Sequence, residues 1–291
     1  MKKMNMVAIA VATTLFAGMA SATTLDYRYE YRAATSYDKI DKDTGEKTKE
    51  HIDARHQHRV KLGHSFKLSD KWKHSTGLEI KFHTDDSYYD EDSGSVKNAN
   101  SRSFYDGNWY IYAMEVENTA TYKVDNNWYL QVGMPIAWDW DEPNYNGGDW
   151  KMKKVTYKPQ FRVGYKADMG LTTAIRYRHE FNDFRNYESF GDTDQVADKK
   201  LANAQKSKVT LTGSYKVESL PKLGLSYEAN YVKSHNNVYL YNNDDWEWDA
   251  GLKVNYKFGS WKPFAEIWSS DISSSSKDRE AKYRVGIAYS F

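Results

Sequence analysis

Arginine and lysine recur at alternate positions in short segments along the chain. Arg28 and Arg32 alternate with tyrosines, and Arg176 and Arg178 flank Tyr177. In an extended strand, alternate side chains face opposite sides, so these cations share one face. A guanidinium grips a carboxylate with two parallel hydrogen bonds, and such a face would bind or pass carboxylated solutes. The candidate residues are Arg28, Arg32, Arg55, Arg59, Lys81, Lys158, Arg162, Arg176, Arg178, Lys206, Lys208 and Arg284.

The last segment, 281–291, indicates what kind of wall carries these cations. Its apolar and aromatic residues fall on one face, whereas Lys282 and Arg284 fall on the other. Strict alternation that ends in an aromatic residue, here Phe291, is typical of the closing strand of an outer-membrane β-barrel, with one face on lipid and one on a wet lumen. We expect Phe291 to be read by the barrel-assembly machinery, and lipid and lipopolysaccharide to surround the barrel.

The N-terminus is consistent with export. Lys2 and Lys3 precede a short apolar run, and Ala20-Ser21-Ala22 has the form of a cleavage site, so we expect residues 1–22 to be a signal peptide. Residues 23–291 would form a single barrel domain in the outer membrane. A mean hydropathy of −0.85 is too polar for a helical membrane protein. Without cysteine, the chain has no disulfide framework or metal-thiolate site, and no cofactor is expected.

Alternation recurs in twelve segments, each near the ~10 residues that a tilted spanning strand needs. In the fourth, for example, Tyr110, Tyr112, Met114 and Val116 are expected to face outward. The predicted strands are 25–33, 55–66, 75–84, 109–122, 127–137, 150–167, 170–181, 206–217, 223–232, 246–258, 261–268 and 281–291. Long connections alternate with tight turns, the asymmetry of extracellular loops and periplasmic turns. The fold class is therefore all-β: a twelve-stranded antiparallel transmembrane barrel.

Charge is segregated along the chain. Without Lys2 and Lys3, 39 basic residues stand against 40 acidic ones; the long connections hold 25 acidic and 11 basic, which leaves 15 acidic and 28 basic for wall and turns. A lysine or arginine facing lipid at mid-membrane would cost about 2–4 kcal/mol, so the basic residues should line the lumen and favour anions. For each cation, the alternative is an ion pair across the wall with Asp26, Glu30, Glu115, Glu117, Glu180 or Glu228.

Five segments together resemble the oligogalacturonate-specific porin family, which includes the sialic-acid-inducible porin of enteric bacteria. They are 25–30, 157–162, 175–178, 261–266 and 279–291. The resemblance implies a monomeric twelve-stranded barrel with a narrow, arginine-lined pore that passes acidic oligosaccharides. By position, it implies that Arg28, Arg162, Arg176, Arg178 and Arg284 line the pore. The connections 85–108 and 182–205 look longer and more acidic than the family's, which leaves the particular solute open.

Other chemistry is less well supported. The histidines lack the serine and aspartate spacings of outer-membrane lipases and proteases, so no enzyme is expected. Acidic clusters at 85–92 and 139–142 could bind Ca²⁺, although solvated loop acids explain them as well. Trp138, Trp140, Tyr145 and Trp150 could stack sugars or anchor the rim, and His56 with His58 lacks further metal ligands. No nucleic-acid partner is expected.

Two further functions stay open. The chain could be a general small-solute porin without sugar preference. It could instead be a surface-binding barrel, an adhesin or phage receptor, that acts through its acidic loops.

Overall fold

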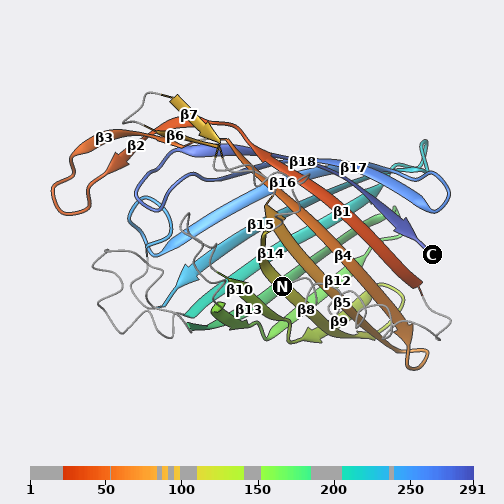
Figure 1. Ribbon diagram of the computed structural model, residues 1–291. Helices are drawn as coiled ribbons and strands as arrows, with labels where there is room; N and C mark the ends of the chain where they lie inside the picture. Colours follow the sequence, from red (N-terminus) through yellow and green to blue (C-terminus); the bar gives the residue numbers. More distant parts are fainter. Residues whose placement is uncertain are drawn as a thin grey trace.

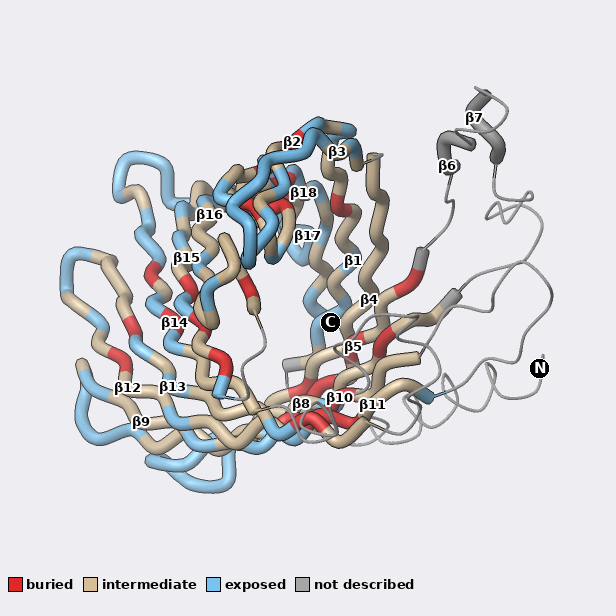
Figure 2. Tube along the Cα trace, turned by 90° about the vertical axis from the view of Figure 1, so that its left-hand side faces the viewer, coloured by how far each residue is buried: buried red, intermediate tan, exposed pale blue. Residues whose placement is uncertain are grey.

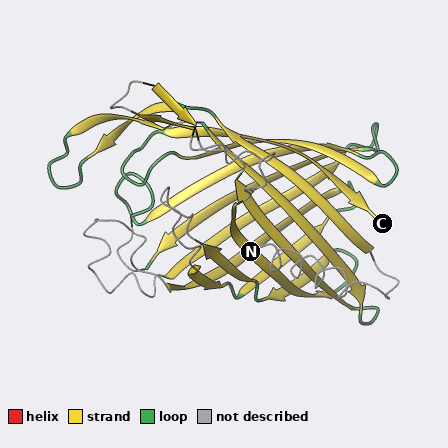
Figure 3. Cartoon of the chain, viewed as in Figure 1, coloured by secondary structure: helices red, strands yellow, loops and turns green. Residues whose placement is uncertain are grey.

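The computed structural model describes residues 22–52, 54–83, 87–90, 95–98, 110–140, 152–184, 205–235 and 239–291. The predicted signal peptide lies almost entirely outside these ranges, as do most of the acidic connections 85–108, 138–149 and 182–205. None of the described residues belongs to a helix with the length and apolar character to cross a membrane. Strands and their connections make up the described part (Figure 3).

One closed antiparallel sheet forms the body of the molecule (Figures 1 and 2). Its first strand, β1, pairs with β4 on one side and with the last strand, β18, on the other. The strands of this sheet are β1 (Ala22–Arg32), β4 (Arg55–Lys67), β5 (Trp72–His83), β8 (Tyr110–Lys123), β9 (Trp128–Gly133), β10 (Ile136–Trp140), β11 (Met152–Tyr157), β12 (Gln160–Lys166), β13 (Leu171–Phe184), β14 (Gln205–Lys216), β15 (Leu223–Ser234), β16 (Trp246–Tyr256), β17 (Trp261–Asp271) and β18 (Arg279–Ser290).

The fourteen segments make up twelve spanning strands of the barrel, because β9 with β10 and β11 with β12 each form one spanning strand with a break in it. The breaks fall at Met134–Pro135 and Lys158–Pro159, where proline lacks the N–H that a ladder needs. Irregular bonds bridge the gaps: Lys158 N donates to the Pro135 carbonyl at 2.9 Å, and His179 N to that of Pro159 at 3.0 Å. The twelve-stranded barrel is confirmed, but two spanning strands that we expected to be continuous are interrupted.

The outward face matches a lipid-facing surface. Leu252 is 64% exposed, Ile175 54% and Val285 53%, values that would be anomalous for a soluble protein and normal for a barrel wrapped in lipid. The same alternation that brings these side chains outward turns the charged residues of each strand inward.

A β-bulge corrects one expectation about β8. Lys81 pairs with Ala113 and Phe82 pairs with Ile111, so the register skips Tyr112. A bulge re-aims the residue it inserts, and Tyr112 lies where Glu30, Arg28 and Arg32 act on its hydroxyl. The outward position predicted for Tyr112 was therefore wrong. Met114 and Val116 follow the expected alternation, opposite Ile80 and Leu78.

The long connections carry hairpins of their own. Strands β2 (Thr35–Ile40) and β3 (Lys47–Ile52) pair with each other, as do β6 (Ser87–Asp90) and β7 (Ser95–Asn98). They project from the barrel end opposite the tight turns (Figure 1). Residues 35–52, 239–245 and 272–278 form what we call the outer loop layer. Ile40 N donates to Ser275 O at 2.8 Å, and Asn243 Nδ2 to Ile40 O at 2.9 Å.

Candidate functional site

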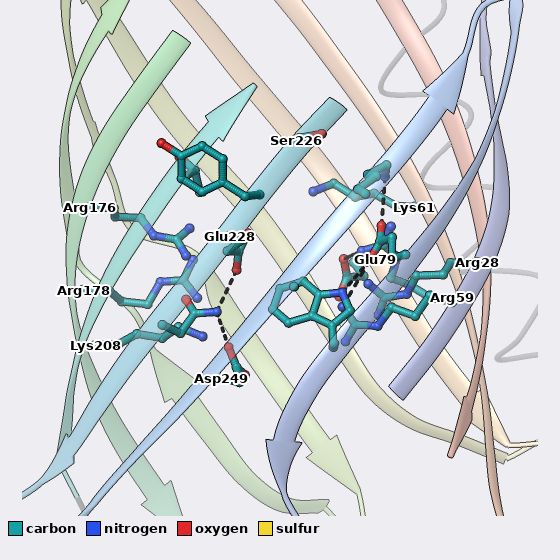
Figure 4. A pocket seen from close by; sticks show the side chains of 18 of the residues that line it. Arg28, Arg59, Lys61, Glu79, Arg176, Arg178, Lys208, Ser226, Glu228 and Asp249 are labelled. Carbon is teal, nitrogen blue, oxygen red and sulfur yellow. Dashed lines mark hydrogen bonds and ion pairs between the residues drawn. The ribbon is translucent and has the colours of Figure 1, made fainter. Parts of the chain in front are cut away.

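The inner face of the barrel encloses a cavity of about 600 Å³. Figure 4 shows its basic side chains on two walls, with Arg176, Arg178 and Lys208 on one and Arg28, Arg59 and Lys61 on the other. Of the twelve residues predicted from the sequence, eight line it: Arg28, Arg59, Lys81, Lys158, Arg176, Arg178, Lys208 and Arg284. Arg32, Arg55, Arg162 and Lys206 lie outside this lining, although the strand register places them on the same inner face.

The charges of the lining nearly balance. Its basic residues are Arg28, Arg59, Lys61, Lys81, Lys158, Arg176, Arg178, Lys208, Lys253 and Arg284. Its acidic residues are Glu79, Glu115, Glu117, Glu180, Glu228, Asp249 and Glu266. Ten cations minus seven anions leave a surplus of three positive charges. The lumen is thus cationic, but less so than the counts for the whole wall suggested.

Most cations on the β1–β4–β5 wall and on β18 are held by carboxylates. Arg284 Nε lies 2.6 Å from Glu30 Oε2, and its Nη1 lies 3.3 Å from Glu266 Oε2. Arg59 pairs with both Asp26 and Glu79. Other pairs on these strands are Lys61–Glu117 (2.7 Å), Lys81–Glu79 (3.2 Å), Arg32–Glu30 (3.0 Å), Arg32–Glu280 (2.8 Å), Arg55–Glu280 (2.6 Å) and Arg279–Asp271. Elsewhere on the inner wall, Lys158 pairs with Glu115 at 2.8 Å and Lys253 with Glu266 at 2.9 Å.

A second group of predicted residues has no such partner. Within the described part of the chain, no carboxylate lies within 4.0 Å of the charged groups of Arg28, Arg162, Arg176, Lys206 or Lys208. The Nε atoms of the three arginines are buried without a hydrogen-bond acceptor. Arg178 is intermediate: it donates twice to Gln160 Oε1, at 3.0 and 2.8 Å, and lies 3.9 Å from Glu180.

Like charges also stand directly opposite one another in the sheet. Arg28 pairs with Arg59 and Arg32 with Arg55 between β1 and β4. Two further pairs are Arg162 with Arg176, between β12 and β13, and Arg178 with Lys208, between β13 and β14. Like charges in this position destabilise a sheet. Their accumulation on one inner face therefore argues for a use in function rather than in folding.

The comparisons with known proteins agree with this geometry. Residues 149–291 match the family model described as oligogalacturonate-specific porin protein (KdgM). This match covers 143 of the 291 residues, so the C-terminal part of the chain is similar to the oligogalacturonate-specific porin family. Within it, the porin KdgM of Dickeya dadantii (strain 3937) is 32% identical over 137 residues, 46% of this chain and 53% of the relative. The aligned region thus spans about half the length of the curated relatives that the chain matches.

Solved structures extend the likeness to the whole barrel. The NanC porin superposes with a TM-score of 0.54 at 15% identity, covering 91% of this chain and 98% of its own. An outer-membrane channel from Pseudomonas putida F1 gives 0.60 at 11% identity, covering 94% and 97%. At these identities the likeness shows the fold alone. Together with the match of the C-terminal part to an outer-membrane porin family, it places the barrel in the outer membrane.

Several residues that line the cavity were absent from the predicted set. Lys61 and Lys253 alternate regularly with apolar residues and could have been included. Trp268 was missed because its strand has the weakest alternation. A Cβ atom on Gly251 would lie 2.3 Å from the Trp268 ring, so this ring packs directly on the glycine. The Arg284 guanidinium carbon lies 4.5 Å from the Trp268 ring centroid, and Trp268 Nε1 donates to Glu266 at 2.9 Å.

The other predicted sites fare differently. Asp139, from one acidic cluster, pairs with Lys154 at 3.1 Å, whereas Asp141, Glu142 and most of the cluster at 85–92 lie outside the described residues. Tyr145 and Trp150 also lie outside them. His56 and His58 each accept or donate a hydrogen bond with a β1 tyrosine, at 2.6 and 2.8 Å.

Proposed function

We propose that the chain is a passive outer-membrane channel that favours anions and passes carboxylated oligosaccharides, of which oligogalacturonate is the model. The observation that carries the proposal is the group of unpaired cations on the inner wall: Arg28, Arg162, Arg176, Lys206 and Lys208. Among the residues that the structure describes, no carboxylate accepts a hydrogen bond from these groups. The family that residues 149–291 match is that of oligogalacturonate-specific porins, which supports the same class of solute.

The mechanism requires no covalent step and no cofactor. Guanidinium and ammonium groups occupy neighbouring positions along the wall. A carboxylate of the solute can therefore bind the next cation as it leaves the previous one. Each contact is weak because the lumen is wet and polar, and weak contacts allow release. The paired cations contribute to the electrostatic potential of the lumen and stabilise the barrel wall, whereas the unpaired cations contact the solute. A single barrel encloses the pathway, so we propose that the monomer is sufficient.

A general small-solute porin is the second candidate, because seven carboxylates share the lining with ten cations. Liposome swelling separates the two. Vesicles that contain the purified protein are exposed to trigalacturonate and to a neutral trisaccharide of similar size. Faster entry of trigalacturonate supports the proposed selectivity, and equal rates favour the general porin.

A surface-binding role for the loops is tested by deleting residues 85–108. If the loops act as a receptor, binding of cells or phage would be lost, while liposome swelling would persist.

A further inference from the structure

A straight row of hydrogen-bonded side chains crosses four strands of the inner wall. Arg176 stands opposite Thr210, Thr210 opposite Asn230, and Asn230 opposite Asp249. Arg176 Nη2 donates to Thr210 Oγ1 at 3.0 Å, and Thr210 Oγ1 donates to Asn230 Oδ1 at 2.8 Å. Asn230 Nδ2 then donates to Glu228 Oε1 at 2.9 Å and to Asp249 Oδ1 at 2.6 Å. Figure 4 marks the last two bonds by dashed lines that end on Glu228 and Asp249.

The polarity of this row runs in one direction. Arginine only donates, and a carboxylate only accepts. A threonine hydroxyl and an asparagine amide each do both, so the two neutral residues relay hydrogen bonds from the cation toward the anions. Thr210 is fully buried and Asn230 is 5% exposed, which fixes both in place. Both hydrogens of the Asn230 amide are used, one for each carboxylate.

Without this row, an ion pair would be within reach. Glu228 lies two strands from Arg176, a separation of roughly 10 Å at the ~4.8 Å spacing of paired strands. An extended arginine and glutamate can span that distance. Opposite charges attract each other even in a wet lumen, so the carboxylate would form an ion pair with Arg176 unless another partner held it.

We propose that Thr210 and Asn230 are positioning residues that keep Arg176 unpaired by holding Glu228 and Asp249 on β15 and β16. The inference rests on the proposed function, since it assigns to the unpaired Arg176 the contact with the solute. It explains why Arg176 has no carboxylate partner among the described residues, although Glu228 and Asp249 lie on the same stretch of wall. It also makes two uncharged residues determinants of charge selectivity.

The test uses Asn230→Leu, which leaves the formal charge unchanged. Asn255→Leu is the matched control. Asn255 lies on β16, where it shares the inner face with Asp249, but it donates to the backbone carbonyl of Gly224 at 3.1 Å rather than to a carboxylate. Folded protein is verified by its heat-modifiable electrophoretic mobility, and Thr210→Val is the second variant if Asn230→Leu does not fold. The chloride-to-potassium permeability ratio is measured from the reversal potential in a KCl gradient, and the half-blocking concentration of trigalacturonate from the current.

We expect Asn230→Leu to lower the permeability ratio and to raise the half-blocking concentration at least about tenfold, the loss expected for one charge-assisted contact. Asn255→Leu should change neither. Glu228→Gln should raise the permeability ratio more in the Asn230→Leu background than in the wild type, because only there does Glu228 neutralise Arg176. Equal ratios for the two leucine variants, or an additive effect of Glu228→Gln, would overturn the inference. If trigalacturonate does not block the wild type, the proposed function fails, while the permeability ratios still test the positioning.

Discussion

Arg162 of β12 and Arg176 of β13 are direct cross-strand neighbours on the inner wall of the barrel. No carboxylate in the described part of the chain lies within ion-pair distance of either guanidinium. A sheet that was optimised only for stability would not keep such a pair, because like charges directly opposite each other are unfavourable. We interpret the pair as functional: the repulsion between the two arginines lowers the stability of the sheet, and both cations remain able to contact anions.

This relationship predicts a trade-off for Arg162→Met, which keeps most of the side-chain stem and removes the charge. The midpoint of urea unfolding should rise, corresponding to about 0.2–1 kcal/mol from relief of the repulsion. The chloride-to-potassium permeability ratio should fall. Arg59→Met is the matched control. It removes the ion-pair partner of Asp26 and Glu79, so we expect it to lower the free energy of unfolding by about 1–3 kcal/mol. A destabilised Arg162→Met protein would contradict the functional interpretation of the pair.

Trp268 supplies a second prediction. A valine at position 251 would collide with the Trp268 ring, since even a Cβ atom there lies 2.3 Å from it. Gly251→Val should displace the ring, separate it from Arg284 and narrow the lumen. Single-channel conductance and tryptophan fluorescence report both effects. Ala250→Val, at the adjacent outward-facing position, should leave conductance unchanged; if the two variants conduct alike, Trp268 does not shape the pathway.

Much of the fold follows from the sequence because strand alternation is local. Phe82 and Ile80 lie on one face and Lys81 and Glu79 on the other, a pattern that is visible without coordinates. The displaced Tyr112 was not predictable in this way, since a bulge depends on the registers of both partners. The interruptions at Pro135 and Pro159 could have been anticipated, because proline has no N–H to donate.

The candidate site was predictable in composition but not in pairing. The sequence places Arg176 and Arg284 on the same inner face, with equal claims to contact a solute. The structure separates them: Arg284 forms ion pairs with Glu30 and Glu266, whereas among the described residues Arg176 donates its side-chain hydrogen bond to Thr210. These contacts join strands far apart in the sequence, and their geometry depends on register. Alternation alone therefore cannot tell an unpaired cation from a paired one.

The outer loop layer has a small core of its own. Leu240 and Ile272 are buried at 8% and 7% exposure, and Asn243 N donates to Ser274 O at 2.7 Å. Truncating such residues to alanine costs about 2–5 kcal/mol, here borne by loops rather than by the barrel. Leu240→Ala should therefore make residues 239–245 and 272–278 sensitive to protease on intact cells, with conductance retained. Leu220→Ala, at an exposed position, is the control, and equal sensitivity would refute a packed layer.

The tight turn between β8 and β9 predicts a pH effect. Backbone N–H groups of Trp128 and Asn127 donate to Asp125 Oδ1 at 2.7 and 2.8 Å, and they hold the pKa of this carboxyl below its usual value. A lowered folded-state pKa stabilises the protein above the unfolded-state value and loses that effect as pH falls through the folded-state value. Titration by NMR should show the low pKa. Asp125→Ala should lower the unfolding midpoint at pH 7 but not at pH 2; the same deficit at both would contradict this role.

The central claim is that unpaired cations make the channel selective for carboxylated sugars. A planar-bilayer recording under a KCl gradient, with trigalacturonate then added, tests it most directly. The account predicts an anion-directed reversal potential and a concentration-dependent block, both weakened in a variant that carries Arg162→Ala, Arg176→Ala and Arg178→Ala. A cation-directed potential without block, unchanged in that variant, would contradict the proposed selectivity while leaving the barrel intact.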